Sequence, residues 1–196
     1  METLAFVRRC GPLWVKKLIW NLDFRRVRWD KCRPCEKLVG LLLQVLRPDS
    51  SLLDLGCANG ALVAHLRGQG WNGPYTGVDV SSEALRSASQ QGLASCQWIV
   101  SDMCDFATSS HYDVIVASES LYYLRIEEAT RLLQRLPGFL TSCGIIVIRI
   151  HDCEQYKDYV AAIETIYPTA RKLIVGEGIG FFILQTNDPA ASASRK

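Results

Sequence analysis

From about residue 50 to residue 185, short apolar runs alternate with longer segments in which apolar residues recur every three or four positions. The short runs are typical of buried strands, and the periodic segments are typical of helices that pack on them. The pattern predicts strands at residues 51–55, 75–79, 96–100, 112–117, 143–150, 170–175 and 179–185. It predicts helices at about residues 60–68, 82–90, 125–138 and 154–165. This alternation indicates an α/β fold on a mostly parallel sheet.

The last two predicted strands differ from the others in their connection. Only Gly176-Glu177-Gly178 separates them, and a loop of this length permits a hairpin but is too short for a parallel crossover. One antiparallel strand should therefore end an otherwise parallel sheet.

Two further helices are predicted ahead of the alternating region, a short amphipathic one at residues 11–20 and a second at residues 36–46. The pattern thus divides the chain into a helical arm at residues 1–35 and a body at residues 36–186. The remaining residues, 187–196, are rich in Ala and Ser, and we expect them to form a disordered tail.

Charge is distributed unevenly between the arm and the body. The 196 residues are 48% hydrophobic and carry a net charge of only +2, which favours one folded domain over a disordered chain or a protein that coats DNA. Residues 1–40 contain ten Lys or Arg and four Asp or Glu, a net +6, which leaves −4 for the other 156 residues. The basic arm suggests an anionic partner such as a phosphate, a carboxylate or a lipid headgroup. A solvated basic helix is the alternative.

The eight cysteines do not suggest a disulfide framework. We recognise no signal peptide and no apolar run long enough to span a bilayer, so we expect reduced thiols and a cytoplasmic protein. Cys32 and Cys35 have the C-x-x-C spacing of zinc and redox sites, but no second ligand pair and no thioredoxin-like context accompany them. No metal site is predicted.

The strongest motif is the turn Gly56-Cys57-Ala58-Asn59-Gly60, which follows the first predicted strand and opens a helix. Glycines without a Cβ atom let a ligand come into contact with the backbone. The turn lacks the lysine of a triphosphate-binding loop, and Ala58 replaces the second glycine of the dinucleotide pattern.

Two acidic residues follow neighbouring predicted strands. Asp79 lies 23 residues beyond Gly56, close to the spacing of an acid that binds a ribose diol. Asp102 follows the next strand, and ligands of open α/β sheets lie beyond such strand ends.

Together, four stretches resemble the successive motifs of class I S-adenosylmethionine-dependent methyltransferases. They are Asp54–Gly60, Gly77–Ser81, Ser101–Met103 and Tyr112–Leu124. The resemblance covers roughly residues 36–186 and implies a Rossmann-like α/β fold, with a seven-stranded, mostly parallel sheet, helices on both faces and a C-terminal antiparallel hairpin strand. It also implies S-adenosyl-L-methionine as the cofactor. A different nucleotide-binding Rossmann-like domain is the alternative.

The same resemblance implies roles for the residues of the motifs. The methionine moiety would be lined by Gly56, Cys57, Asn59 and Gly60, with Asp54 supporting its ammonium group. The ribose hydroxyls would be held by Asp79, and the adenine would meet Val80, Asp102 and the Met103 backbone. Ser118 completes the expected cofactor-contacting set.

The segment Ser118–Leu124 resembles the acceptor side of small-molecule methyltransferases, including the N-methyltransferases of nodulation-factor synthesis. The Asn/Asp-Pro-Pro-Tyr/Phe signature of base methylation is absent, so a nucleic-acid acceptor is not expected. A hydroxyl acceptor needs a base, whereas an amine needs only to be neutral and oriented. The candidate catalytic residues are Glu119, Tyr122 and His151, with Tyr123 as a further possibility.

We therefore expect a methyltransferase that acts on a nitrogen or oxygen of a small, anionic molecule, over which the N-terminal helices close. The alternatives are an inactive cofactor-binding protein that acts on a partner or a membrane, and a protein or RNA methyltransferase. Glu119 and Glu128 have the spacing of the paired glutamates in protein arginine methyltransferases. We expect Glu128 on the exposed side of its helix, which disfavours a protein arginine methyltransferase. The oligomeric state is left open.

Overall fold

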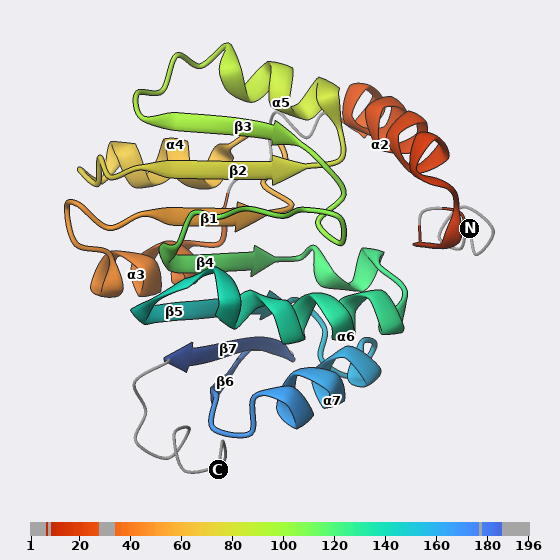
Figure 1. Ribbon diagram of the computed structural model, residues 1–196, viewed down its shortest axis with the longest axis vertical. Helices are drawn as coiled ribbons and strands as arrows, with labels where there is room; N and C mark the ends of the chain where they lie inside the picture. Colours follow the sequence, from red (N-terminus) through yellow and green to blue (C-terminus); the bar gives the residue numbers. More distant parts are fainter. Residues whose placement is uncertain (1–6, 8, 28–33, 177, 186–196) are drawn as a thin grey trace.

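Seven strands form one sheet in the order β3-β2-β1-β4-β5-β7-β6 (Figure 1). The computed structural model describes residue 7 and residues 9–27, 34–176 and 178–185. The strands are β1 (Leu52–Leu55), β2 (Tyr75–Asp79), β3 (Cys96–Val100), β4 (Tyr112–Ser118), β5 (Leu140–Ile150), β6 (Arg171–Val175) and β7 (Ile179–Gln185). Strands β1 to β5 pair in parallel, and β7 pairs antiparallel with both β5 and β6. The predicted α/β fold with one antiparallel strand is confirmed.

The position of the antiparallel strand differs from the expectation that it ends the sheet. β7 lies between β5 and β6, and β6 forms the edge. The sequences explain this order, because β7 is almost wholly apolar and largely buried, whereas β6 begins with Arg171 and Lys172 and is mostly exposed. The more apolar strand takes the interior place.

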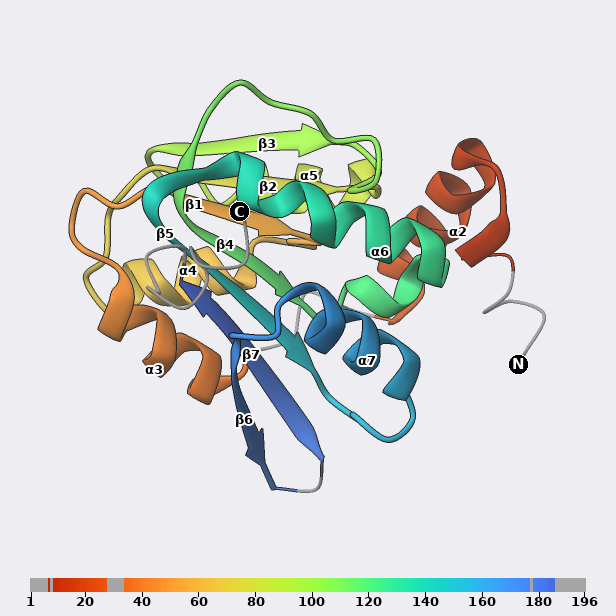
Figure 2. The ribbon, with the colours of Figure 1, turned by 60° about the horizontal axis from the view of Figure 1, so that its bottom comes forward.

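Helices cover both faces of the sheet (Figures 1 and 2). On one face lie α3 (Glu36–Val45), α4 (Ala61–Gly68) and α5 (Ser82–Ser89), and on the other lie α6 (Ile126–Arg135) and α7 (Lys157–Ile166). Each set buries an apolar face against the strands, so the sheet separates two hydrophobic cores. The α3–α5 core includes Leu42, Val63 and Leu85, and the α6–α7 core includes Leu132 and Ile163.

The end of α6 shows how one residue shortens a predicted helix. The pattern predicted a helix to residue 138, but α6 ends at Arg135 and a 3₁₀ turn follows at Leu136–Phe139. Pro137 has no N–H to donate to the carbonyl of Leu133 four residues earlier. The hydroxyl of Tyr167 donates to that carbonyl instead.

The N-terminal helix α2 (Leu13–Val27) is longer than the predicted segment 11–20 and is not amphipathic in the expected sense. It lies beyond the carboxyl ends of the strands, beside α5 (Figure 1). Apolar side chains occur on both its inner and outer sides, because Trp20 and Phe24 line a cavity while Trp14 and Leu18 face solvent. The predicted disordered tail lies outside the described residues.

Within the described ranges, no helix combines the length and the apolar character needed to cross a bilayer.

Candidate active site

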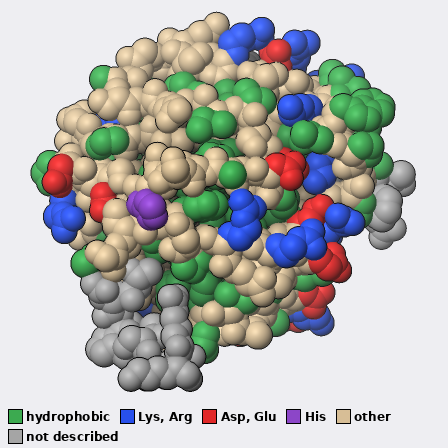
Figure 3. Space-filling model, in the orientation of Figure 1, with side chains coloured by type: hydrophobic (Ala, Val, Ile, Leu, Met, Phe, Trp, Pro, Cys, Tyr) green, Lys and Arg blue, Asp and Glu red, His purple; other side chains and the backbone are tan. Residues whose placement is uncertain are grey.

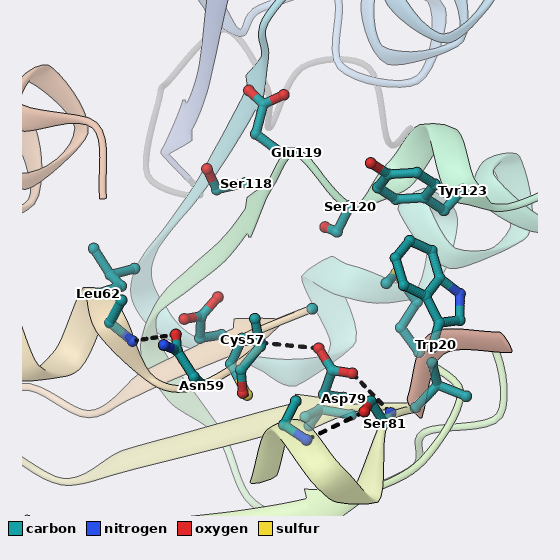
Figure 4. A pocket seen from close by; sticks show the side chains of 18 of the residues that line it. Trp20, Cys57, Asn59, Leu62, Asp79, Ser81, Ser118, Glu119, Ser120 and Tyr123 are labelled. Atoms are coloured by element: carbon teal, nitrogen blue, oxygen red, sulfur yellow. Dashed lines mark hydrogen bonds between the residues drawn. The ribbon is translucent and has the colours of Figure 1, made fainter. Parts of the chain in front are cut away.

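A cavity of about 430 Å³ lies at the carboxyl ends of the strands, where the strand order reverses between β1 and β4 (Figure 4). Ligands of open α/β sheets bind at this position. The predicted site residues that line the cavity are Asp54, Gly56, Cys57, Asn59, Asp79, Val80, Asp102, Met103, Ser118, Glu119, Tyr122 and His151. The remaining predicted residue, Gly60, is not among the lining residues.

The glycine turn between β1 and α4 takes a backbone path that only glycine follows easily. Gly56 and Gly60 have φ angles of +83° and +73°. A Cβ atom on Gly56 would lie 2.5 Å from the Ser120 Cβ, and one on Gly60 would lie 2.5 Å from the Trp98 ring. Both glycines are therefore required by packing as well as by conformation, and Gly60 acts behind the cavity wall.

Asp79 holds the glycine turn in place from the end of β2. Its Oδ2 accepts a hydrogen bond from the Ala58 N–H at 2.9 Å, and its Oδ1 accepts one from the Ser81 N–H at 2.8 Å (Figure 4). Burial raises the pKa of this carboxyl group, and the backbone donors act against that rise. Each oxygen keeps a second lone pair that can accept from a ligand.

Asp54 is buried in β1 beneath the same turn. Its Oδ2 accepts a hydrogen bond from the Tyr75 hydroxyl at 2.7 Å. Burial raises the pKa of Asp54 to about 7, the Tyr75 hydrogen bond lowers it, and the nearby charge of Asp79 raises it further. A cationic group in the cavity would favour the ionised form.

Asp102 is tied to the N-terminal helix. Its Oδ1 accepts from the Cys104 N–H at 3.0 Å, and its Oδ2 lies 3.1 Å from the Lys16 Nζ of α2. The Glu128 carboxylate lies 3.8 Å from the same ammonium. Burial lowers the pKa of Lys16, but Asp102 and Glu128 outweigh that effect and leave it raised. The expectation that Glu128 lies on an exposed helix side is wrong, because its side chain is only 13% exposed.

On the opposite side of the cavity, Glu119 is the centre of a polar cluster. Its Oε2 accepts a hydrogen bond from the Tyr122 hydroxyl and lies 2.5 Å from the Nδ1 of His151. Its Oε1 lies 2.6 Å from the Nη1 of Arg149, an ion contact without hydrogen-bond alignment. Burial, followed by the Glu119 contact, raises the pKa of Tyr122, so this hydroxyl stays protonated.

The backbone of Glu119 is also unusual. Its φ angle is +58°, in the left-handed region that non-glycine residues seldom adopt. Its N–H donates to the carbonyl of Arg149, which fixes the residue across the β4–β5 pair. Backbone strain of this kind concentrates at functional sites.

Sequence reasoning missed Arg149 and Lys16. Arg149 was detectable, because it interrupts an apolar run and lies two positions before His151, a spacing that places both side chains on the same side of an extended strand. Lys16 carried no such signal, since its partner Asp102 is 86 residues away.

Aromatic rings line the acceptor side of the cavity. The ring of Trp20 from α2 packs edge-on against Tyr123 at 4.7 Å between centroids (Figure 4). Tyr122 stacks on Tyr156 at 4.0 Å, and His151 meets both of these tyrosines edge-on. The cavity therefore combines an acidic, glycine-rich half with an aromatic half.

The C-x-x-C pair is only partly described. Cys35 lines the cavity, and Cys32 lies outside the described residues. Across the part of the chain that the structure describes, no group of three His, Cys, Asp or Glu side chains could hold a metal ion.

A family model described as a methyltransferase domain matches residues 52–144. Nodulation protein S of Azorhizobium caulinodans is 30% identical over 141 residues, which are 68% of this chain and 67% of that protein. Trans-aconitate 2-methyltransferase of an Enterobacter species is 28% identical over 138 residues, 70% of this chain and 53% of that protein. The matched part of the chain spans 61–67% of the length of the Nodulation protein S relatives.

The fold also matches solved structures. The N-methyltransferase NodS of Bradyrhizobium japonicum WM9, in complex with S-adenosyl-L-homocysteine, has a TM-score of 0.63 at 20% identity. The match covers 82% of this chain and 91% of that one.

Proposed function

The chain belongs to the class I S-adenosylmethionine-dependent methyltransferases, of the Nodulation protein S type, and we propose that it methylates a nitrogen or oxygen atom of a small-molecule acceptor. S-adenosylmethionine is the cofactor, and it supplies a methyl group activated on a sulfonium sulfur. One observation carries the proposal: the glycine turn and the Glu119–Tyr122–His151 cluster line the same cavity. The resemblance to trans-aconitate 2-methyltransferase supports a small acceptor.

The residues of the cavity fit this cofactor. A volume of about 430 Å³ is within the range of small-molecule sites. Asp79 has free lone pairs on both oxygens for two ribose hydroxyls, and Asp54 is placed to pair with an ammonium group. Gly56 lines the cavity with backbone alone, which a ligand can contact. Asp102 keeps lone pairs for the adenine amino group in addition to the bond from Lys16.

The Glu119–His151 contact prepares a proton acceptor. When neutral His151 donates its Nδ1–H to Glu119, its Nε2 is left without a proton and can accept one. Glu119 then stabilises the imidazolium that forms, as the carboxylate does in a Ser-His-Asp triad. The Tyr122 hydroxyl, which also donates to Glu119, orients the carboxylate. This arrangement suits the removal of a proton from a hydroxyl or an ammonium acceptor.

We also propose that the acceptor carries an anionic group. Arg149 lies on the acceptor side of the cavity, and its buried Nε–H has no hydrogen-bond partner among the described residues. An unsatisfied guanidinium donor favours a carboxylate or phosphate oxygen. The positive charge of residues 1–40 acts in the same direction.

Two further proposals concern the whole chain. Residues 1–35 would act as a lid, which the position of Trp20 and Phe24 in the cavity wall supports. A cytoplasmic location is in line with the free thiols of the seven cysteines that the structure describes.

The function is tested by methyl transfer in an extract of small molecules. Purified protein is incubated with the extract and methyl-labelled S-adenosylmethionine, and mass spectrometry follows the label. We expect label in a small compound. Label found only in protein or RNA, or none at all from a protein that binds the cofactor, would instead support one of the alternative functions.

The role of His151 is tested in the same assay. For a hydroxyl acceptor, we expect His151→Ala to lower turnover by about 10²–10⁴-fold with cofactor affinity unchanged. The matched control is His65→Ala, because His65 is exposed on α4, outside the cavity wall. Equal turnover in the two variants on an O-methylated product would exclude His151 as the base.

A further inference from the structure

The outer side of α2 carries large apolar side chains in solvent. Trp14, Leu18 and Leu22 follow one another at intervals of four residues, so they lie on one side of the helix, and they are 69%, 52% and 38% exposed. Of the six large hydrophobic residues exposed within the described ranges, only Val100 and Ile174 lie outside α2. We call Trp14, Leu18 and Leu22 the outer face of α2. Figure 3 shows hydrophobic side chains gathered at the upper right, where α2 lies in Figure 1.

The contacts of α2 with the body fix the rotation of the helix about its own axis, and therefore fix the outer face in solvent. α2 is fixed to the body by polar contacts that are specific in their partners, from Lys16 on its inner side and from Asn21 and Arg25 nearer its C-terminal end. Lys16 pairs with Asp102, the Asn21 Oδ1 accepts from the Ser81 hydroxyl at 2.8 Å, and Arg25 pairs with Glu83 at 2.9 Å. Rotating α2 to bury the outer face would break all three contacts and expose the buried ammonium of Lys16.

Positively charged residues accompany the outer face, both on α2 and in the sequence next to it. On the helix, Lys17 and Arg26 lie on the two sides of the apolar stripe, and Arg26 is exposed. The flanking sequence adds Arg8, Arg28, Lys31 and Arg33 against only Glu2 and Asp30, whereas Arg9 donates to the carbonyl of Tyr122 in the body. The other 156 residues of the chain, from residue 41 onward, carry a net −4. An anionic surface would therefore attract the α2 end of the molecule and orient it.

We propose that the outer face of α2 docks on an anionic lipid surface. A helix with Trp and Leu on one side and Lys and Arg beside them is typical of segments that lie in the membrane interface. The indole of Trp14 suits the headgroup level, and the two leucines suit the acyl boundary. The same helix lines the cavity through Trp20 and Phe24, so docking would bring the site close to the lipid surface.

Charge argues against a second copy of the chain as the occupant. In a symmetric pair, α2 would face α2, and Lys17 and Arg26 of each copy would lie near those of the other. Like charges across an interface oppose association, whereas anionic headgroups neutralise them.

The proposal is tested by sedimentation of the full chain with phosphatidylcholine vesicles that do or do not contain phosphatidylglycerol. We expect binding to the anionic vesicles that weakens as salt is added. The triple variant Trp14→Ser, Leu18→Ser, Leu22→Ser should lose at least about tenfold in partition coefficient. Lys17→Gln and Arg26→Gln should each lose about fivefold.

Ile174→Ser is the matched control, because Ile174 is 51% exposed on β6. β6 is the edge of the sheet opposite to β3, and α2 lies on the β3 side, where it contacts α5. It should bind vesicles like the unchanged chain. Calorimetry with S-adenosylhomocysteine should give the same affinity for the triple variant, which would show that it is folded. Equal binding to both vesicle types, or a triple variant that binds as well as the unchanged chain, would overturn the proposal. A dimer in lipid-free solution that the triple variant abolishes would assign the face to a second copy and also overturn it.

Discussion

Asp54 is the carboxyl group whose ionisation the fold changes most clearly. It is wholly enclosed in β1, and burial is the main reason that its pKa rises to about 7. In an unfolded chain the pKa of an aspartate is about 3.9. The folded protein therefore keeps a proton on Asp54 over a range of pH in which the unfolded chain has released it.

We expect this difference to appear as a pH dependence of stability. Below pH ~4 both states hold the proton, and the contribution to the free energy of unfolding is fully present. Between pH ~4 and ~7 that contribution is lost at up to about 1.4 kcal/mol per pH unit, because only the folded state still binds the proton. Asp54→Asn, which keeps an acceptor for the Tyr75 hydroxyl, should remove this loss in urea unfolding measured across that range.

Asp113→Asn is the control, because folding shifts the pKa of Asp113 in the opposite direction to that of Asp54. Burial raises the pKa of Asp113, but hydrogen bonds from Ser51 and Thr141 outweigh it and leave the pKa lowered. Its contribution should be present above the unfolded pKa and be lost as the pH falls. If Asp54→Asn and the unchanged chain show parallel curves between pH ~4 and ~7, the buried carboxyl does not hold its proton.

The site residues that could be predicted from the sequence are those that lie at the carboxyl ends of strands. Asp54 lies one residue before the end of β1, Asp79 ends β2 and Asp102 follows β3. The carboxyl ends of such parallel strands meet at one edge of the sheet. The partner of Asp102 could not be predicted in this way, because Lys16 reaches it from a helix outside the sheet. The burial of Glu128 could not be predicted for the same reason, because Lys16 of α2 lies on one side of its carboxylate and Arg125 on the other.

Among the helices and strands, α2 is the element whose character the sequence pattern predicted wrongly. The pattern predicted a short amphipathic helix, but the inner side of α2 lines the cavity with Trp20 and Phe24 and its outer face is apolar as well. Apolar periodicity reports burial in a core, and neither side of α2 packs into one. The strands and α3 to α5, which do bury an apolar side, were predicted to within one or two residues, except that β5 begins at Leu140, three residues before its predicted start.

The attachment of α2 depends on Lys16, and we expect Lys16→Met to loosen the helix. With α2 in place, the variant leaves Asp102 and Glu128 without their shared cation, whereas opening lets water reach both carboxylates. Amide hydrogen exchange of α2 should become about 10- to 100-fold faster, the equivalent of roughly 1.4–2.8 kcal/mol for leaving buried charges unpaired.

Lys17→Met is the matched control for this measurement. It removes the same charge from the neighbouring position, where the structure shows no ion pair with Asp102 or Glu128. Exchange in α2 should then stay close to that of the unchanged chain. Similar exchange rates in the two variants would mean that α2 is held by its other contacts, with Ser81 and Glu83 of the α5 region.

At the scale of the whole molecule, the candidate site joins the two halves of the sheet. The glycine turn follows β1, Asp79 ends β2, and Asp102 follows β3. Glu119 and His151 follow β4 and β5, on the other side of the strand reversal. A ligand that contacts both groups stabilises the fold as a unit, because it binds only when all these strand ends are assembled.

We therefore expect cofactor to raise the melting temperature of the whole chain. At about 100 times its dissociation constant, a ligand that binds only the folded state stabilises it by about 2.7 kcal/mol. For a chain of this length that corresponds to a shift of about 5–10 °C. S-adenosylhomocysteine should produce this shift in calorimetry, and NAD at the same concentration should produce little, because the turn lacks the second glycine of the dinucleotide pattern.

Asp79→Asn tests whether the shift arises at the predicted ribose contact. The amide nitrogen of the variant would face one of the two backbone donors, from Ala58 or Ser81, so the ligand-free melting temperature should fall slightly. The informative quantity is the shift with S-adenosylhomocysteine, which a loss of about 1.5–3 kcal/mol in binding should nearly abolish. Asp49→Asn is the control, because Asp49 is exposed in the turn before β1 and outside the cavity wall. A full shift in Asp79→Asn would show that the cofactor is held without this carboxylate, and the assignment of the acidic half of the cavity would have to be abandoned.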